Sequence, residues 1–467
     1  MAENAPKCYD VVFLGGGPAG YQGAIRASQL GGRVAVVEQE YLGGVCLNRG
    51  CIPTKALRAS VEVLRLARKS KSFGINVENV IPNVPAMIAR KNRVVELLRG
   101  GIEYLFEQNR VDLYQGIGRL LEPGVLEVNE EDGLTKVYAC KVVLATGSRT
   151  SRPGFLTGEQ PGVLTTDDIL EMTAAPASLL VLGGGAVGVE MAVIMVELGS
   201  KVTLLEREDR ILPREDAEAA AYLQSLLKRR KVKVLTGARV EQVQGDQNVT
   251  VTLAGGDTLS AEKLLLAAGR KVNAENIGLE NIGMPVDGKP LQVDEHMLTG
   301  VPGIYAAGDL AGKTWLAHGA FAEGITAAEH ALGRPAAMDY RVVPRCVFST
   351  PEFAAVGMSE EEAKAQYNVK SVTFPFRSLG MAQAMGDWEG MVKLVVDSKT
   401  EQLLGGHIVG PHAGDLIAEV ALAMQNKIGI RGIVETIHTH PTLSEAVLET
   451  AQGVLGLAIH MDPVDRS

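Results

Sequence analysis

The sequence predicts an α/β protein with two Rossmann-like dinucleotide-binding domains and a C-terminal α+β domain. A strand, a glycine-rich turn and a helix follow one another at residues 9–40, and the same succession returns at 178–208. The last third of the chain, from about Val343, alternates strands and helices without a nucleotide motif. A chain of 467 residues is long enough for about three domains. We therefore expect two nucleotide-binding domains and one domain of different construction.

The composition is that of an ordinary globular chain, with 46% hydrophobic and 22% charged residues. A net charge of −9 argues against nucleic acid or an anionic membrane as the main partner. No apolar run approaches the roughly 18 residues that a membrane span requires, and we recognise no leader before the first expected strand, at about Asp10. Five cysteines do not make a disulfide scaffold, and Cys8, Cys140 and Cys346 are isolated. A reducing cytoplasm is the expected compartment.

The first nucleotide motif begins with a short apolar strand, Val11 to Leu14. A G-x-G-x-x-G turn and a helix to about Leu30 come next, and a second strand, Val34 to Val37, ends at Glu38. The glycines of the turn are Gly15, Gly17 and Gly20. They let the backbone approach a pyrophosphate at the helix N-terminus, while the acid at the strand end can take ribose hydroxyls.

The second motif repeats this arrangement with Gly183, Gly185, Gly188 and Glu206. Glu206 lies as far beyond its first glycine as Glu38 lies beyond Gly15. A single turn of this kind can be kept only for helix–strand packing. Two complete units indicate two dinucleotide sites in one chain.

The segments around the second motif are predicted from their periodicity. Residues Val84 to Arg110 have helical spacing, with apolar Met87, Ile88, Val94, Val95, Leu97 and Leu98. Short strands follow to Val143, with a hairpin turn at Asp132-Gly133. Buried strands are expected at 142–149, 263–273 and 303–310. In the last third, strands at 391–397 and 403–410 alternate with helices, one of which opens with a capping box at Ser359 and Glu362.

Cys46 and Cys51 are the most informative pair of residues in the chain. Residues five apart on an undistorted helix cannot form a disulfide. A bridge therefore needs Cys46 at or before a helix N-terminus, with the chain bent around Gly50 and Pro53. Such a small ring stabilises a fold only weakly, which suits a bond that opens and closes. Two free thiols or a zinc site are the alternatives, but no further Cys or His lies at ligand spacing. We predict redox chemistry and no metal site.

Taken together, the motifs resemble the flavoprotein pyridine nucleotide–disulfide oxidoreductases over essentially the whole chain. The resemblance is carried by GGGPAG with Glu38, GGVCLNRGCIPTKAL (43–57), ATGS (145–148), GGGAVGVE with Glu206, AAGR, GIYAAGDL (303–310), LAHGAFAEG (316–324) and HTHPTLSEAV (438–447). Within the family, the chain is most similar to the members that oxidise dihydrolipoyl groups of 2-oxo acid dehydrogenase complexes or the glycine cleavage system.

The resemblance implies two cofactors and four parts of the chain. FAD is expected in the first unit and NAD in the second. The expected parts are an FAD-binding domain (1–149), an NAD-binding domain (150–270), a central segment packing with the FAD domain (271–342) and a C-terminal dimerisation domain (343–467). The residues expected to bind the cofactors are Gly15, Gly17, Pro18, Ala19, Gly20, Glu38, Gly44, Val45, Cys46, Lys55, Gly116, Thr146, Gly147, Ser148, Gly183, Gly185, Val187, Gly188, Glu190, Glu206, Val240, Gly269, Asp309, Leu316, Ala317 and His318.

The same resemblance gives roles to the catalytic candidates. Asp309 would hold the ribityl chain of FAD, Ala317 and His318 would lie beside the flavin ring, and Lys55 would lie near it, paired with Glu190. Cys51, at the head of a helix, fits the thiolate against the flavin, and Cys46 then exchanges with substrate sulfur. His440, held by Glu445, is the expected base for the dihydrolipoyl proton. His438 and His440 could also face one side as metal ligands, but no third ligand is evident, and His438 is expected to support His440.

Three positions depart from the family pattern, and rival assignments fit less well. Val45 replaces a threonine and removes one hydroxyl contact to FAD, Trp315 replaces a methionine, and Arg49 adds charge inside the disulfide loop. Glutathione-type reductases bind the 2′-phosphate of NADPH with arginines, whereas Glu206 would repel this phosphate. Mercuric reductase has a C-terminal cysteine pair, and the last residues of this sequence, HMDPVDRS, contain no cysteine. A non-catalytic flavoprotein scaffold would not need the cysteine pair or His440 and Glu445. The expected partners are therefore a second copy of the chain and lipoyl domains.

Overall fold

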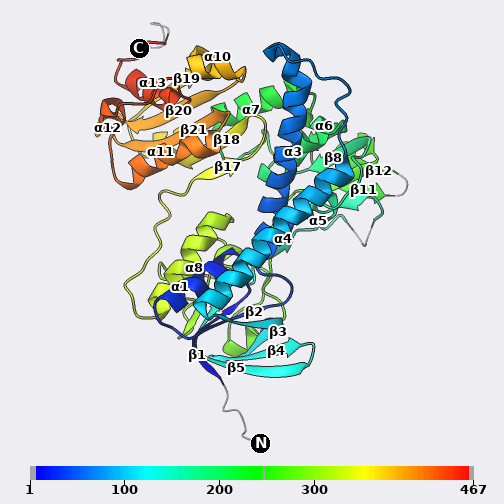
Figure 1. Cartoon of the computed structure of the whole chain (residues 1–467), viewed down its shortest axis with the longest axis vertical. Helices are drawn as coiled ribbons and strands as arrows, with labels where there is room; N and C mark the ends of the chain where they lie inside the picture. The colour runs from blue at the N-terminus through cyan, green and yellow to red at the C-terminus, as the bar shows by residue number, and fades with distance from the viewer. Residues whose placement is uncertain (1–6, 157, 159, 246–247, 462–467) are drawn as a thin grey trace, which may run out of the picture. The chain divides into compact units, whose positions relative to one another are not determined.

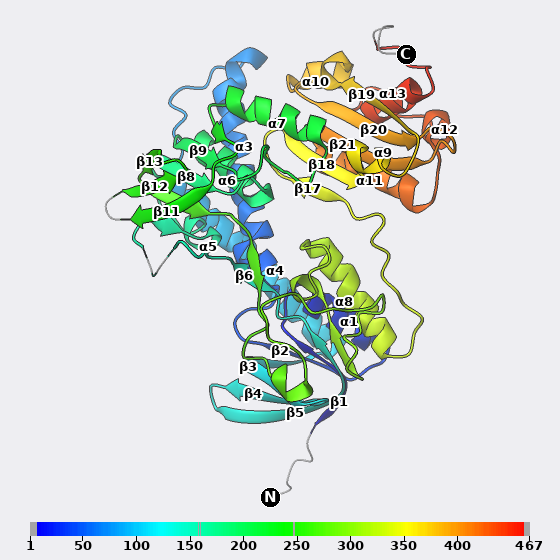
Figure 2. The ribbon, with the colours of Figure 1, turned by 180° about the vertical axis from the view of Figure 1, so that it is seen from behind.

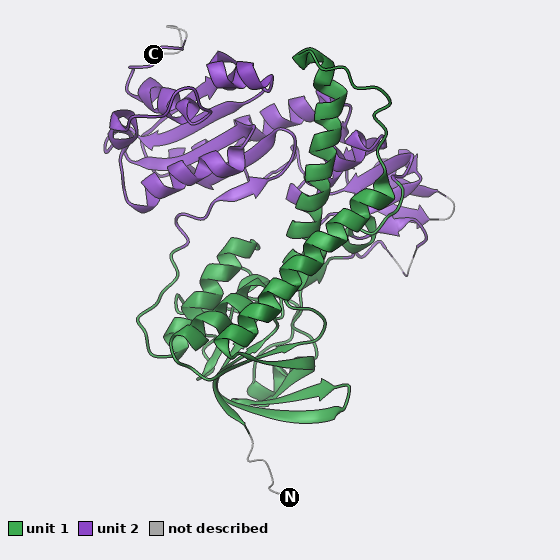
Figure 3. Ribbon diagram, in the orientation of Figure 1, with its two compact units in different colours: residues 1–151, 166–174, 269–339 green, residues 152–165, 175–268, 340–467 purple. Residues whose placement is uncertain are grey.

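The computed structural model describes all residues except 1–6, 157, 159, 246–247 and 462–467. It confirms the predicted α/β fold and divides into two compact units (Figure 3). Unit 1 comprises residues 1–151, 166–174 and 269–339; unit 2 comprises 152–165, 175–268 and 340–467. The four-part division of the chain expected from the resemblance stays a prediction.

Unit 1 is built around a six-stranded sheet of order β1-β2-β3-β4-β5-β16, in which β1 also pairs with β5. Strands β1, β2 and β16 are short, apolar and largely buried, and so are the last three residues of β5, as expected of strands covered on both faces. Helices α1 and α8 pack together against this sheet (Figure 1). The strands are β1 (Cys8–Leu14), β2 (Val34–Glu38), β3 (Asp112–Glu122), β4 (Val125–Glu130), β5 (Gly133–Leu144) and β16 (Ile304–Ala306), with a separate pair β6 (Ser148–Thr150) and β15 (Arg270–Val272).

The helices of unit 1 carry the residues between these strands. They are α1 (Pro18–Gln29), α2 (Gly44–Arg49), α3 (Cys51–Lys69), α4 (Val84–Asn109), α5 (Thr166–Ile169) and α8 (Ala317–Ala331), with short 3-10 turns at Ser70–Phe73, Glu280–Ile282 and Gly308–Leu310. The predicted helix at Val84 to Arg110 is confirmed as α4. Its buried stripe, however, is Ile88, Val95, Ile102 and Phe106, which fall on one face of a 3.6-residue period. Leu97 and Leu98, expected among the apolar residues of this helix, are 75% and 40% exposed.

Several boundaries differ from the sequence prediction. The buried strands expected at 142–149, 263–273 and 303–310 are interrupted after Leu144, Leu266 and Ala306. The first strand begins at Cys8 rather than at about Asp10, because β5 offers partners from Tyr138 onward. The hairpin between β4 and β5 turns at Glu131 and Asp132, one residue before the predicted pair. Gly133 is already the first residue of β5, opposite Glu130, and its positive φ of 131° explains why glycine stands there.

Unit 2 begins with the second nucleotide-binding sheet, of order β10-β9-β8-β14-β7 and parallel throughout. A three-stranded antiparallel sheet, β11-β12-β13, accompanies it and is seen in Figure 2. The elements are β7 (Val163–Leu164), β8 (Ser178–Leu182), α6 (Ala186–Glu197), β9 (Lys201–Leu205), α7 (Ala217–Arg229), β10 (Lys233–Leu235), β11 (Val240–Gly245), β12 (Val249–Leu253), β13 (Thr258–Ala261) and β14 (Lys263–Leu266).

The C-terminal part of unit 2 is an antiparallel five-stranded sheet of order β17-β18-β21-β20-β19 with helices packed on it. The strands predicted at 391–397 and 403–410 are β20 and β21 with the expected bounds, and the capping box at Ser359 and Glu362 is formed. The elements are β17 (Arg345–Val347), β18 (Glu352–Gly357), α9 (Glu360–Lys364), β19 (Val369–Pro375), a 3-10 turn (Phe376–Ser378), α10 (Gly380–Met385), β20 (Met391–Asp397), β21 (Leu403–Gly410), α11 (Ala413–Gln425), α12 (Ile430–Glu435) and α13 (Glu445–Val454).

Candidate active site and cofactor sites

The first glycine turn is fixed by close backbone approaches. Gly15 has φ +109°, and a Cβ there would lie 2.4 Å from the carbonyl oxygen of Ala145. A Cβ on Gly20 would lie 1.8 Å from the carbonyl oxygen of Gly15. Neither position can carry a side chain without moving backbone, so helix α1 starts directly against β1.

The second turn has the same construction. Gly183 has φ +112°, and its Cβ would lie 2.3 Å from the carbonyl oxygen of Ala267. A Cβ on Gly188 would lie 1.9 Å from the carbonyl oxygen of Gly183. The repeat recognised in the sequence is therefore a repeat of backbone contacts as well.

Glu38 and Glu206 are bound in the same way to their own turns. The carboxylate of Glu38 accepts the N–H of Gly16 at 2.7 Å and that of Glu40 at 2.8 Å. Glu206 accepts the N–H of Gly184 at 2.6 Å and that of Glu208 at 2.9 Å. Burial raises the pKa of Glu38, and these backbone N–H groups offset part of that rise. Each acid thus fixes its turn, and each carboxylate oxygen keeps a second lone pair for a ribose hydroxyl.

The two helix N-termini have the features of phosphate sites. Gly17 and Gly185 cap α1 and α6 in extended conformation, with no side-chain cap and no acidic residue in the first turn. A Cβ on Gly185 would meet no described atom within 4 Å, so glycine is not required there by packing. Open space before uncapped backbone N–H groups fits the pyrophosphate of a dinucleotide. The described residues of each turn therefore fit a dinucleotide, the class to which FAD and NAD belong.

The cysteine pair lies where two helices meet. Cys46 is in the first turn of the short helix α2, rather than at or before a helix N-terminus, and Cys51 is the first residue of α3. Gly50, with φ −137° and ψ −106°, interrupts the helix between them, and Pro53 is accommodated in the first turn of α3. The predicted bend is therefore made by Gly50 alone, and it replaces the continuous helix that would hold the two sulfurs apart.

The Cys46 thiol hydrogen-bonds with Cys51, and this bond, together with burial, raises the pKa of Cys46. The nearby Lys55 ammonium and the Cys51 backbone N–H act in the opposite direction. Arg49, the extra charge noted in the loop, forms an ion pair with Glu40 and lies 3.9 Å from Asp167. Its charge is therefore met by carboxylates outside the cysteine pair.

Lys55 lies in α3 of unit 1, and Glu190 lies buried in α6 of unit 2. An oxygen of Glu190 accepts the backbone N–H of Phe348 at 2.9 Å. The pairing of Lys55 with Glu190 stays a prediction.

Asp309 belongs to a network that closes the end of the six-stranded sheet of unit 1. Its carboxylate accepts the hydroxyl of Ser148, and Ser148 in turn accepts Nε of Arg270 at 2.6 Å. Thr146 is tied to this region through Asn273, because its hydroxyl donates to the Asn273 carbonyl oxygen at 2.7 Å. Gly147 and Gly269 have φ of +69° and +127° in the turns that join these strands. The predicted residues Thr146, Gly147, Ser148, Gly269 and Asp309 are thus brought together.

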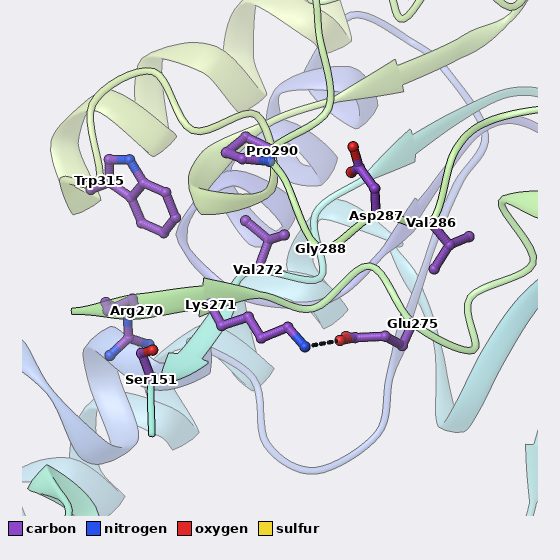
Figure 4. A pocket seen from close by; sticks show the side chains of 10 residues that line it. All are labelled: Ser151, Arg270, Lys271, Val272, Glu275, Val286, Asp287, Gly288, Pro290 and Trp315. Atoms are coloured by element: carbon purple, nitrogen blue, oxygen red, sulfur yellow. Dashed lines mark ion pairs between the residues drawn. The ribbon is translucent and has the colours of Figure 1, made fainter. Parts of the chain in front are cut away.

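A hollow of about 520 Å³ lies beside this network (Figure 4). It is lined by Ser151, Arg270, Lys271, Val272, Glu275, Val286, Asp287, Gly288, Pro290 and Trp315. Lys271 forms an ion pair with Glu275 at 2.7 Å, and Trp315 packs against the core of unit 1. None of the predicted cofactor residues is among the described residues that line the hollow.

The remaining predicted cofactor residues occupy varied positions. Leu316 caps α8, and Ala317 and His318 are its first residues. Gly116 lies in β3, where a Cβ would lie 2.5 Å from the carbonyl oxygen of Asn129. Val45 and Val187 are 37% and 41% exposed, whereas the side chain of Val240 is buried in the core of the second nucleotide part. Val240 could therefore contact a ligand only through its backbone atoms.

His440 and Glu445 are joined as predicted. Nδ1 of His440 lies 2.8 Å from Oε1 of Glu445, and Oε2 accepts the Thr442 N–H at 2.8 Å. Burial by itself would raise the pKa of Glu445, but these hydrogen bonds outweigh it and lower the pKa. The His440 side chain is 79% exposed, so its Nε2 faces outward from the domain. His438 bonds separately to Glu419 at 2.7 Å, and no cluster of three metal-ligating side chains occurs among the described residues.

Sequence reasoning missed two contributors to the site. The Thr442 N–H fixes Glu445, and Asn48 ties α2 to Arg99 of α4. A backbone donor has no residue signature, and Arg99 lies on a helix of ordinary polar and apolar alternation. The one sequence signal for Asn48 is its position between Cys46 and Cys51.

Comparison with known proteins identifies the class. The family described as pyridine nucleotide-disulphide oxidoreductase matches residues 9–324, and its dimerisation domain matches residues 343–451. This chain belongs to the pyridine nucleotide–disulphide oxidoreductase family, as its motifs indicated. In the described part of the chain, no helix is long and apolar enough to span a membrane.

Among its relatives are dihydrolipoyl dehydrogenases. The chain is 42% identical to that of Bacillus subtilis over 469 residues, which cover 97% of this chain and 99% of the relative. It is 41% identical to that of Thermus scotoductus over 471 residues, with the same coverage. Among solved structures it is similar to LpdA from Mycobacterium tuberculosis, with a TM-score of 0.89, 30% identity and coverage of 95% and 98%. The HOCl-induced flavoprotein disulfide reductase RclA from Escherichia coli gives a TM-score of 0.84 at 29% identity, with coverage of 95% and 99%.

Proposed function

We propose that this chain catalyses the dihydrolipoyl dehydrogenase reaction, in which a protein-bound dihydrolipoyl group is oxidised and NAD⁺ is reduced to NADH. The observation that carries the proposal is the hydrogen-bonded pair Cys46 and Cys51 at a helix break beside the first nucleotide turn. Relatives with this activity cover nearly the whole chain.

The thiol chemistry follows from the pair itself. A thiolate of the dihydrolipoyl group attacks Sγ of Cys46, which breaks the Cys46–Cys51 bond and leaves Cys51 as the thiolate. The second substrate sulfur then attacks the mixed disulfide, so that the substrate leaves as a cyclic disulfide and Cys46 leaves as a thiol. The position of Cys51 as the first residue of α3 supports this division of roles, because a helix N-terminus favours a thiolate.

His440 accepts the proton of the attacking thiol. A carboxylate is only an acceptor, so Glu445 holds the proton of His440 on Nδ1 and leaves Nε2 free to act as the base. Glu445 therefore fixes both the tautomer and the ring orientation.

The cofactor sites complete the reaction. FAD, when bound, supplies the two-electron couple that links the dithiol to NAD⁺. The proposed FAD residues are those of the first turn with Glu38, the 146–148 strand end and Asp309; the proposed NAD residues are those of the second turn with Glu206. The remaining predicted positions, including Val45, Lys55 and Leu316 to His318, stay in the proposal as ligands of the same two cofactors.

We further propose that the enzyme is a homodimer that serves lipoyl domains. The dimerisation domain exposes large apolar side chains, among them Leu422 (63%), Ile437 (97%) and Ile459 (71%). A second copy would cover such a surface. Lipoyl domains as partners, of a 2-oxo acid dehydrogenase or glycine cleavage complex, rest on the relatives. A cytoplasmic location rests on cysteine usage and likewise stays a prediction.

The test compares acceptors and donors side by side on the FAD-loaded protein. NADH-dependent reduction of lipoamide should exceed reduction of glutathione disulfide and of oxygen by orders of magnitude, and dihydrolipoamide should reduce NAD⁺. Comparable turnover with glutathione disulfide would favour the glutathione-type alternative. If the protein reduces none of these disulfides, the scaffold alternative is favoured.

A further inference from the structure

The side chain of Asn48 ties the helix that carries Cys46 to its surroundings. Its Nδ2 donates to the carbonyl oxygens of Leu42 at 3.0 Å and Gly44 at 2.9 Å. Its Oδ1 accepts Nε and Nη2 of Arg99 at 3.1 and 2.8 Å. Both N–H groups and the oxygen of the amide are thus used, which fixes its orientation.

Arg99 is itself fixed from a second side. Its guanidinium carbon lies 3.7 Å from the centroid of the Tyr41 ring, within the range of a cation–π contact. Arg99 comes from α4, 51 residues beyond Asn48 in the sequence. The guanidinium therefore joins α4 to both ends of the segment Tyr41 to Asn48.

That segment also rests on the first nucleotide turn. The N–H of Gly43 donates to the carbonyl oxygen of Gly16 at 2.8 Å, and a Cβ on Gly44 would lie 2.7 Å from the Cα of Gly17. The Asn48–Arg99 pair thus holds a short stretch of backbone between the nucleotide turn and Cys46.

We infer that Arg99 is a positioning residue for the redox pair: through Asn48 and Tyr41 it holds α2 so that the sulfur of Cys46 stays within bonding reach of Cys51. This inference rests on the proposed disulfide chemistry. The stability of a protein disulfide relative to a dithiol in solution depends on the effective concentration of its two thiols, which a fixed backbone raises. Loosening α2 lowers that effective concentration and makes the disulfide easier to reduce.

The experiment measures the thiol–disulfide equilibrium of the FAD-loaded protein. The purified protein is equilibrated without oxygen against mixtures of reduced and oxidised dithiothreitol. The reference dithiol forms one S–S bond as the Cys46–Cys51 bond breaks, and acid quenching, alkylation and mass spectrometry then give the reduced fraction. Arg99→Leu should shift the equilibrium toward the protein dithiol by about threefold to tenfold, and tenfold equals about 30 mV for a two-electron couple.

Two further variants separate positioning from general damage. Arg99→Lys keeps the charge but cannot make the forked contact to Asn48, so it should shift the equilibrium in the same direction by a smaller factor. Arg93→Leu removes an exposed arginine from the same helix and should leave the equilibrium unchanged. FAD content and the KM for NAD⁺ should stay near those of the parent in all three proteins.

The outcomes are distinct. If the parent pair exchanges with dithiothreitol and both Arg99 variants match it, the inference is wrong while the proposed function stands. If Arg93→Leu shifts the equilibrium as much as Arg99→Leu, the effect is not one of positioning and the inference is again wrong. If the parent cysteines do not exchange with the dithiol at all, the proposed function itself fails.

Discussion

His440 and Glu445 form a 2.8 Å hydrogen bond in which the second oxygen of Glu445 is already bound by the backbone N–H of Thr442. This arrangement fixes which atom of residue 445 faces His440. The N–H of Thr442 is a donor, so an amide side chain at position 445 would turn its oxygen, rather than its NH₂ group, toward Thr442.

Glu445→Gln should therefore reverse the polarity of the bond to His440. Glutamine has one oxygen, which would face the Thr442 N–H and leave its NH₂ group toward Nδ1. His440 would then carry its proton on Nε2 and could not act as the base. We expect a loss in dihydrolipoamide turnover of about 10²-fold or more, with little change in the KM for NAD⁺. Asp415→Asn, at an exposed histidine–carboxylate pair of the same domain, is the matched control and should leave the turnover of dihydrolipoamide unchanged. Turnover within twofold of the parent would show that Glu445 does not orient the base.

A second prediction is that each active site is shared by two chains. Cys46 belongs to unit 1, and His440 lies in the domain whose family model describes dimerisation. Mixed dimers of Cys46→Ser and His440→Gln chains, purified with two tags, should recover about half of normal turnover, although each parent homodimer is nearly inactive. One of their two sites combines an intact cysteine pair with an intact histidine. If both groups act within one chain, every site carries a lesion and purified mixed dimers stay inactive.

The third prediction concerns nucleotide choice. Two backbone N–H groups hold the Glu206 carboxylate at the end of β9, where a 2′-phosphate dianion would meet its charge. The parent should prefer NADH over NADPH by at least about tenfold in kcat/KM. Glu206→Ala should narrow this preference, mainly by weakening the binding of NADH, because the contact to the ribose and the hydrogen bonds that fix the turn are both lost. Glu241→Ala, an exposed acid on β11, serves as the control. Equal use of the two nucleotides by the parent would refute the assignment.

A fourth prediction concerns the buried ion cluster around Lys393. The Lys393 side chain is 3% exposed, and its Nζ lies 3.1 Å from Asp216, 2.9 Å from Glu218 and 2.7 Å from Glu360. Burial by itself would raise the pKa of Glu360, but hydrogen bonds from Lys364 and Lys393 hold it at about 2; the pKa of Asp216 is also lowered. Lys393→Met should destabilise the protein by about 3 kcal/mol, since it removes the ammonium that lies against the buried carboxylate of Asp216.

The pH dependence of this cluster has a definite sign. A carboxylate whose pKa is lower in the folded state binds more protons when unfolded, so its stabilisation is complete above about pH 4.5 and is lost as the pH falls toward 2. The thermal midpoint of the parent should therefore decrease as the pH falls through this window, and the thermal midpoint of Lys393→Met should decrease less steeply. Lys289→Met, at an exposed pair with Asp287, should keep the parent slope. Equal slopes for the parent and Lys393→Met would contradict the prediction.

Features set by local sequence were predictable. The strands at 391–397 and 403–410 pair with each other across a short turn, and the capping box joins residues three apart, Ser359 and Glu362. The two glycine turns were recognisable from their spacing, although they pack against Ala145 and Ala267, which are distant in the sequence. The link between His440 and Glu445 also joins near neighbours. The position of Cys46 inside α2 was not predicted, because Gly50 breaks the helix without help from Pro53.

Contacts between distant segments could not be read from the chain. Nothing in residues 41–48 indicates that Arg99 closes on Asn48 and Tyr41, since the contact depends on how α4 packs beside α2. Leu97 and Leu98 were expected among the apolar residues of α4 because of their type, yet the face that the core covers is set by Ile88 and Val95. Hydropathy alone does not say which apolar residues a neighbouring element will cover.

The paired glycines at the two turns restrict how this chain can evolve. Any side chain at Gly20 or Gly188 would lie within 2 Å of a carbonyl oxygen of its own turn, so neither position has a neutral substitution. The two constraints are independent, because the two turns belong to different compact units. Inactivating changes can therefore accumulate in one nucleotide half while the other stays intact. A lineage that loses Gly188 would retain the first turn and the thiol pair, and its descendants would be recognisable by one preserved glycine signature beside an eroded one.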